Sequence, residues 1–181
     1  NSYDDIPFNF YRDMQINEDY FWSYSHINIP TESDNLFEKV NNINYIFIHN
    51  SASNGLAFTI EEIEQKLNND REKTLIINPC QNIYTPDNDF YNISQEFLNH
   101  PLAFYVTTII NASKIILTDS SFFCMAINLP IKTKECYLKS RDNRSYQHLY
   151  KNIKLDKLNR KQFISLSGIT DITTQSTPYL N

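Results

Sequence analysis

The chain has 181 residues, of which 41% are hydrophobic, 14% aromatic and 20% charged, and its formal net charge is −5. This composition excludes an intrinsically disordered chain and suffices for one domain with a full hydrophobic core. The acidic balance argues against a nucleic-acid-binding protein, which carries a basic excess, and no apolar run reaches the ~18 residues that a membrane span requires.

The N-terminal part of the chain predicts a segment that packs on a larger body. Residues 1–30 are rich in aromatic residues that follow no regular period, which predicts an extended lead-in with a short helix or two. Thr31 is a candidate N-cap for a helix over residues 32–42, where apolar residues recur at helical spacing. We therefore expect residues 1–43 to form an N-terminal arm and helix.

The first strand and the helix after it have clear local signals. The run YIFIH, Tyr45–His49, is apolar, rich in β-formers and bounded by asparagines, so it predicts a buried strand. The turn-forming stretch NSASNG follows it. Thr59, with Glu62 three residues later, is a capping box that opens the next helix.

The remaining segments continue the same alternation of strands and helices. The expected strands cover residues 74–78, 114–118 and 135–139, and the expected helices cover 91–99, 102–112, 120–128 and 146–153. Continuous apolar strands between helices are typical of a parallel sheet covered on both faces. The predicted fold is α/β, a Rossmann-like three-layer αβα domain with a mainly parallel sheet over residues 44–165, followed by a C-terminal tail over 166–181.

The run SKIILTDSSFFCMAINLP, residues 113–130, holds the strongest candidate site. A buried strand stops at Asp119, turns through Ser120 and Ser121, and continues into an apolar helix. In open α/β sheets ligands bind at the carboxyl ends of strands, where helix N-termini point N–H groups at anions. Two interpretations stay open: these three side chains contact a ligand, or they are ordinary helix caps.

Two other strand ends lie at the same edge by topology. The loop after the first strand could wrap a pyrophosphate with backbone N–H groups, and its candidate ligand contacts are Asn50, Ser51, Ser53, Asn54 and Gly55. His49 is either a base or anion contact, or a strand-end histidine bonded to backbone. Asn78 either reads a base or sugar, or belongs to a plain turn.

Basic residues follow the fourth strand. Arg141 and Arg144 suit a diphosphate, because guanidinium forks match phosphate oxygens, although a solvated basic turn explains them equally well. Patterns typical of other chemistry are absent from the sequence, namely the hydrolase elbow G-x-S-x-G, the zinc motif H-E-x-x-H and the phosphate-binding P-loop. The three cysteines are odd in number and widely spaced, which predicts neither a disulfide framework nor a zinc site.

The order of these segments carries a family resemblance. The residues concerned are Ala112-Ser113, Ile115 to Thr118, Asp119-Ser120-Ser121, Ala126 and Pro130. Over residues 44–140 the chain resembles the C-terminal, nucleotide-sugar-binding half of GT-B glycosyltransferases, most closely the heptosyltransferase type. One departure is that Ser121-Phe122 stands where the family has a glycine after its acid-serine pair. The asparagine-rich composition is similar to that of proteins from giant DNA viruses or AT-rich bacteria.

The resemblance implies a function in glycan biosynthesis. It implies that Asp119, Ser120 and Ser121 face the diphosphate of a nucleoside-diphosphate sugar, with the loop after His49 opposite them. The expected function is that of a glycosyltransferase domain that transfers the sugar to a glycan or protein acceptor, with His49 and Asp119 as candidate catalytic residues. The alternative is a non-catalytic nucleotide- or carbohydrate-binding or scaffold domain that kept the half-fold.

The resemblance also implies the partners and setting of the domain. GT-B enzymes generally require no bound metal, so neither a metal nor another cofactor is expected, and the nucleotide sugar is the substrate. A complete enzyme needs a second α/β half for the acceptor, which we expect to lie outside this chain because 181 residues are too few for both. The expected location is the cytoplasm, that of the host if the protein is viral.

Overall fold

The structure, a computed structural model, describes residues 14–15, 27–52, 55–56, 58–67, 73–118, 120–139 and 164–165. Its elements, in chain order, are α3 (Thr31–Glu38), β1 (Tyr45–His49), β2 (Ser51–Ala52), β3 (Gly55–Leu56), α4 (Ile60–Leu67), β4 (Leu75–Ile77), α5 (Tyr91–Gln95), the 3-10 helix η2 (Leu102–Tyr105), α6 (Val106–Asn111), β5 (Lys114–Thr118), α7 (Ser121–Ala126), β6 (Cys136–Lys139) and β7 (Ile164–Ser165). The helix expected over 146–153 lies outside the described residues.

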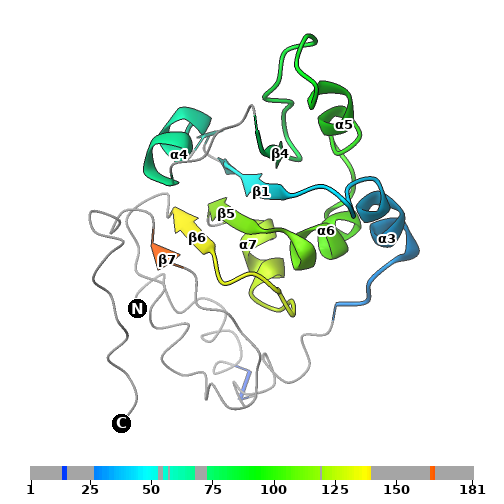
Figure 1. Ribbon diagram of the computed structural model, residues 1–181. Helices are drawn as coiled ribbons and strands as arrows, with labels where there is room; N and C mark the ends of the chain where they lie inside the picture. The colour runs from blue at the N-terminus through cyan, green and yellow to red at the C-terminus, as the bar shows by residue number, and fades with distance from the viewer. Residues whose placement is uncertain are drawn as a thin grey trace.

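The main sheet is parallel and has the order β4-β1-β5-β6-β7 (Figure 1). The chain leaves β1 for β4 on one side, returns past β1 to β5, and then continues outward through β6 to the two-residue β7. Because parallel crossovers are right-handed, this reversal places α4 on the opposite face of the sheet from α6 and α7. The predicted Rossmann-like α/β fold is therefore confirmed.

The strands form the centre of the core, as their continuous apolar runs predicted. Every residue of β1 and of β4 is buried, and so are the last four residues of β5. Phe47 of β1 packs edge-on against Tyr105, with ring centroids 5.9 Å apart, and against Phe122, at 5.7 Å. These aromatic contacts join the sheet to the start of α6 and to α7.

Several helix boundaries differ from the sequence expectations. Thr31 is the first residue of α3 and does not cap it, since the N-cap position belongs to Pro30 and no side chain caps the helix. The segment expected as one helix over 102–112 divides into η2 and α6. The expected capping box is confirmed, because Glu62 N donates to Thr59 Oγ1 at 3.2 Å and Thr59 N donates to Glu62 Oε2 at 3.1 Å.

Helix α3 is docked on α6 by a polar contact rather than by apolar packing alone. Ser33 Oγ, which is fully buried, accepts a hydrogen bond from Thr107 N at 2.8 Å and donates to Thr107 Oγ1 at 3.0 Å. Thr107 Oγ1 in turn donates to Asp34 Oδ1 at 2.7 Å. A side chain of α3 thereby satisfies one of the free N–H groups in the first turn of α6.

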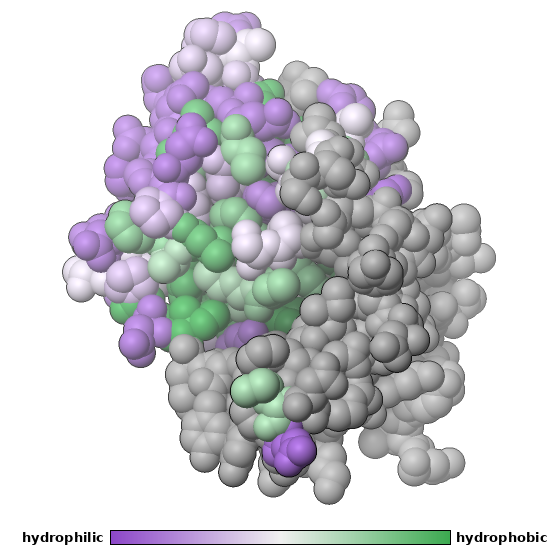
Figure 2. Space-filling view, turned by 180° about the vertical axis from the view of Figure 1, so that it is seen from behind, coloured by the Kyte–Doolittle hydropathy of each residue, from purple (hydrophilic) through white to green (hydrophobic). Residues whose placement is uncertain are grey.

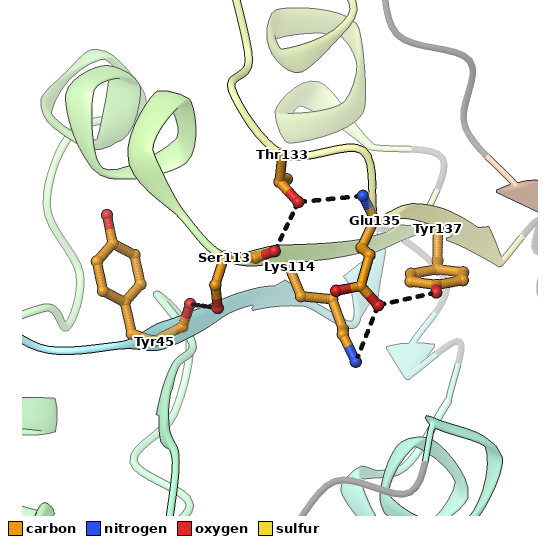
Figure 3. Close-up of polar contacts among 6 residues, drawn as sticks. All are labelled: Tyr45, Ser113, Lys114, Thr133, Glu135 and Tyr137. Atoms are coloured by element: carbon orange, nitrogen blue, oxygen red, sulfur yellow. Dashed lines mark hydrogen bonds and ion pairs between the residues drawn. The ribbon is translucent and has the colours of Figure 1, made fainter.

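The amino edge of the sheet is fastened by short polar side chains (Figure 3). Ser113 Oγ donates to Tyr45 O at 2.6 Å, and Thr133 Oγ1 donates to Ser113 O at 2.6 Å. Glu135 N donates to Thr133 Oγ1 at 3.1 Å, and the Glu135 carboxylate pairs with Lys114 at 3.4 Å. These contacts join the beginnings of β1, β5 and β6. The polar side chains named here are therefore used to hold the strands together.

The surface opposite to the view of Figure 1 is divided by polarity. Figure 2 shows polar residues over its upper part and apolar residues gathered lower down, in the middle of that face. Among the described residues the large hydrophobic side chains that are exposed are Met14, Ile29 and Ile43, which are far apart in sequence. Other apolar residues, including Leu102, Phe104 and Ile127, are partly buried against the core.

The edge strand β4 is covered by side chains from the segment that follows it. Tyr84 Oη accepts from Ile76 N at 2.7 Å and donates to Thr74 O at 3.1 Å. Ser94 Oγ donates to Ile76 O at 3.2 Å. An edge strand with unpaired backbone groups is a template for unwanted pairing, and these hydroxyls occupy those groups.

We expect Tyr84→Phe to lower the free energy of unfolding by about 1–3 kcal/mol, because it leaves the buried Ile76 N–H without its partner. Urea unfolding followed by circular dichroism measures the change. Tyr91→Phe is the matched control, since no hydrogen bond of the Tyr91 hydroxyl occurs among the described residues, and its stability should stay within about 0.5 kcal/mol of the wild type. Equal losses in the two variants would contradict this account of the edge.

Candidate functional site

The candidate site lies at the carboxyl ends of β1 and β5. The main strands, numbered in chain order, are arranged 2-1-3-4-5 across the sheet, so the direction of winding reverses at β1. In doubly wound sheets of this order, ligands bind outside the carboxyl ends of the two strands at that reversal. Here these strands are β1, which ends at His49, and β5, which ends at Thr118.

A side chain from each of these strand ends meets the other at this point. The register pairs His49 with Leu117, and Ser120 follows β5 by two residues. Ser120 Oγ lies 3.0 Å from His49 Nδ1, within hydrogen-bond distance. Two of the residues that the sequence singled out are thus in direct contact, although they are 71 positions apart.

The Ser120 side chain does not cap the helix that it precedes. Ser120 occupies the N-cap position of α7, with the extended backbone typical of a cap (φ −133°, ψ −179°), and its carbonyl accepts the Cys124 N–H at 3.0 Å. No side-chain cap hydrogen bond is formed. The hydroxyl instead contacts His49, so the capping interpretation holds for the backbone position and not for the side chain.

The His49 imidazole is buried and packs at a tilt against an aromatic ring. Its exposure is 7%, and its ring centroid lies 4.3 Å from that of Phe122 with 32° between the planes. Burial lowers the pKa of His49 from 6.5 to about 4, because the charged form loses its hydration. The imidazole is therefore neutral at pH 7.

The two asparagines that follow β1 and β4 bond to each other. Asn78 Nδ2 donates to Asn50 Oδ1 at 3.0 Å, and Asn50 Nδ2 donates to Phe58 O at 3.0 Å. Asn78 Oδ1 accepts from Cys80 N at 3.1 Å. Asn50 is 1% exposed and Asn78 is 3% exposed, so these amides hold the two loops together, and this geometry favours the structural interpretation of Asn78.

The other predicted contacts divide into those that the structure describes and those that it does not. Ser51 pairs with Leu56 in the short antiparallel hairpin of β2 and β3. Gly55 has φ +117°, a backbone angle that residues with a side chain rarely adopt. Ser121 is the exposed first residue of α7. Ser53, Asn54, Asp119, Arg141 and Arg144 lie outside the described residues.

Two further residues contribute to this edge of the sheet. The sequence identified Phe122 only as part of a departure from the family pattern, whereas the structure places its ring against His49. The available signal was its position two residues after Ser120, in the first turn of an apolar helix. Lys139 ends β6 opposite Thr118 in the register, which brings a half-buried lysine to the same edge of the sheet.

The described part of the chain contains no group of three histidine, cysteine or acidic side chains that could hold a metal ion. None of the helices in the described ranges is long and apolar enough to cross a membrane. Comparison of the chain with protein-family models, with curated proteins and with solved structures found no match. The fold therefore establishes the class of the protein, an α/β protein with a Rossmann-like parallel sheet.

Burial of His49 predicts a pH-dependent stability. The unfolded chain binds a proton at this residue with a pKa of 6.5 and the folded chain with a pKa of about 4. Between these values the unfolded state binds more protons than the folded state. The contribution of neutral His49 to the free energy of unfolding is therefore fully present above pH 6.5 and is lost as the pH falls towards 4. We expect a loss of about 2–3 kcal/mol from this residue.

Urea unfolding at pH 7, 6, 5 and 4 measures this loss, with His49→Phe as the reference. That variant keeps a ring against Phe122 and cannot titrate. The wild type should lose more stability than His49→Phe over this range. Identical pH profiles of the two proteins would show that His49 is not held neutral by the fold.

Proposed function

We propose that the carboxyl ends of β1 and β5 bind the diphosphate of a nucleoside-diphosphate sugar, and that the chain is the donor-binding half of a glycosyltransferase. The observation that supports this most is the contact between Ser120 and His49 at the reversal point of the sheet. In doubly wound folds this is the position where nucleotide ligands bind. The resemblance to GT-B enzymes supplies the class of nucleotide.

The polar groups at this edge suit a phosphate-bearing ligand. Ser120 is partly exposed, and its hydroxyl forms no capping hydrogen bond with α7. Lys139 forms no ion pair with any other described residue, so its charge is available to an anion. We assign contacts with the diphosphate to Ser120 and Ser121, and to Asp119 on the strength of the resemblance. Arg141 and Arg144 are added because guanidinium groups suit a diphosphate.

The proposed reaction is transfer of the sugar to a glycan or protein acceptor. A second α/β domain would bind that acceptor, since the chain has room for the donor half alone. The reaction would take place in the cytoplasm, of a host cell if the protein is viral. Stabilisation of the leaving diphosphate by fixed hydrogen-bond donors and cations is the contribution expected of this half.

A non-catalytic binding or scaffold domain is the second candidate, and three observations favour it. Phe122 covers the His49 ring, and a histidine with a pKa of about 4 is a weak base at neutral pH. The Asn50 and Asn78 amides are occupied by each other and by backbone. A domain that kept the fold and lost its chemistry has these features.

The proposal is tested by thermal unfolding in the presence of UDP-, GDP-, ADP- and CMP-sugars. A ligand at 100 times its dissociation constant should stabilise the fold by about 2.7 kcal/mol. We expect one nucleotide class to do so, and Asp119→Ala to remove the shift.

Glu32→Ala is the matched control for this experiment. Glu32 is an exposed acid in the first turn of α3, which lies at the end of the sheet away from the strand arrowheads (Figure 1). This variant should keep the nucleotide-sugar shift. The absence of a shift from every nucleotide sugar would overturn the donor assignment and favour the scaffold alternative.

A further inference from the structure

Two asparagine side chains at the carboxyl edge form a chain of hydrogen bonds whose direction is fixed at both ends. Asn78 Oδ1 is an acceptor, because its partner at 3.1 Å is the backbone N–H of Cys80. Asn78 Nδ2 therefore donates to Asn50 Oδ1 at 3.0 Å. Asn50 Nδ2 in turn donates to the backbone carbonyl of Phe58 at 3.0 Å. A backbone donor at one end and a backbone acceptor at the other leave one arrangement of the two amides.

Neither amide is exposed to a ligand. Asn50 is 1% exposed and Asn78 is 3% exposed. Both polar atoms of each side chain have a partner within the chain of hydrogen bonds. An effect of these asparagines on binding must therefore come from the segments that they hold in place.

The chain of hydrogen bonds closes the base of the β2–β3 hairpin. Asn50 follows β1, and Phe58 stands eight positions later, directly before the capping box of α4, so their hydrogen bond joins the two ends of the hairpin segment. Asn78 ties this closed segment to the loop after β4. A two-stranded hairpin is marginally stable by itself, and here each strand has two residues.

The end of β1 is consequently held from both of its neighbours in the sheet. β4 flanks β1 on one side and β5 flanks it on the other. His49 contacts Ser120, which follows β5, and Asn50 contacts Asn78, which follows β4. The hairpin leaves β1 between these two contacts, at the reversal point of the sheet.

We infer that Asn50 and Asn78 are positioning residues of the candidate site, which fix the β2–β3 hairpin beside the carboxyl end of β1 before a ligand arrives. A hairpin that is already ordered spares a ligand the entropy cost of ordering it. The class of ligand rests on the proposed function, whereas the hold on the hairpin does not.

Amide hydrogen exchange measures the hold on the hairpin without any ligand. Asn78→Ser is the variant of choice, because a serine hydroxyl can still accept from the Cys80 N–H but is too short to reach Asn50. We expect the amides of β2 and β3 to exchange about tenfold faster, as for loss of one hydrogen bond. The amides of β5 and α6 should exchange as in the wild type.

Asn82→Ser is the matched control. Asn82 Oδ1 accepts from the N–H two residues ahead, that of Tyr84, and Asn82 Nδ2 donates to Tyr91 O, each at 3.0 Å. This side chain makes the same kind of turn as Asn78, but its amide is not joined to the hairpin. Asn82→Ser should leave exchange in β2 and β3 unchanged. Equal acceleration in the two variants would overturn the inference.

The consequence for binding can be measured with inorganic pyrophosphate, the part that all nucleoside diphosphates share. We expect Asn78→Ser to weaken pyrophosphate binding about tenfold, because binding then also has to order the hairpin. Asn82→Ser should stay within about twofold of the wild type. Saturating pyrophosphate should return hairpin exchange in Asn78→Ser to the wild-type rate, which a merely structural role would not produce.

Asn50→Ser breaks the same chain from its other end, and it decides the question if Asn78→Ser does not fold. It should give the same faster exchange in β2 and β3 and the same loss of pyrophosphate binding. Wild-type exchange and wild-type binding in this variant would show that the two amides do not position the hairpin.

The two proposals fail in different ways. A wild-type chain that binds pyrophosphate, with the expected loss in Asn78→Ser, but responds to no nucleotide sugar would overturn the donor assignment alone. A chain that is stabilised by a nucleotide sugar, but in which Asn78→Ser changes neither hairpin exchange nor binding, would overturn the positioning role alone. A wild-type chain that binds neither ligand would overturn both.

Discussion

The pairing of β1 with β5 is the contact on which the candidate site depends. Both strands are buried, and their register sets His49 beside Leu117, so that the residue two positions beyond β5 reaches the imidazole. A shift of one residue would turn every side chain of β1 to the other face of the sheet. The apolar residues of β1 and β5 therefore fix the position of a polar contact in which none of them takes part.

The two edges of the sheet use their polar side chains differently. At the amino edge, Ser113 and Thr133 are bonded to backbone of neighbouring strands, and Glu135 is paired with Lys114. At the carboxyl edge, Asn50 and Asn78 are occupied in the same way. The Ser120 hydroxyl, by contrast, contacts no described side chain other than His49, and Ser120 remains partly exposed. The edge with spare hydrogen-bonding capacity is the one where doubly wound folds bind ligands.

The sequence predicted the fold better than it predicted the contacts at the site. The apolar runs of β1, β4 and β5 located the strands to within a residue, and parallel topology then brought His49, Asn78 and Ser120 to one edge. Their partners were not predictable, because Asn50 contacts Asn78 only through the register of two strands. The short hairpin of β2 and β3 was missed because two-residue strands have no periodicity.

The burial of His49 decides which chemistry the pair with Ser120 can perform. A serine and a histidine at hydrogen-bond distance have the spacing of a nucleophile and its base, but a base that loses its proton near pH 4 gains little by taking one from a hydroxyl at pH 7. The same burial keeps the ring neutral at pH 7, and Phe122 packs on it with the ring centroids 4.3 Å apart. Burial therefore leaves His49 able to hydrogen-bond to Ser120 while making it a poor general base, which agrees better with a binding role for this pair than with a catalytic one.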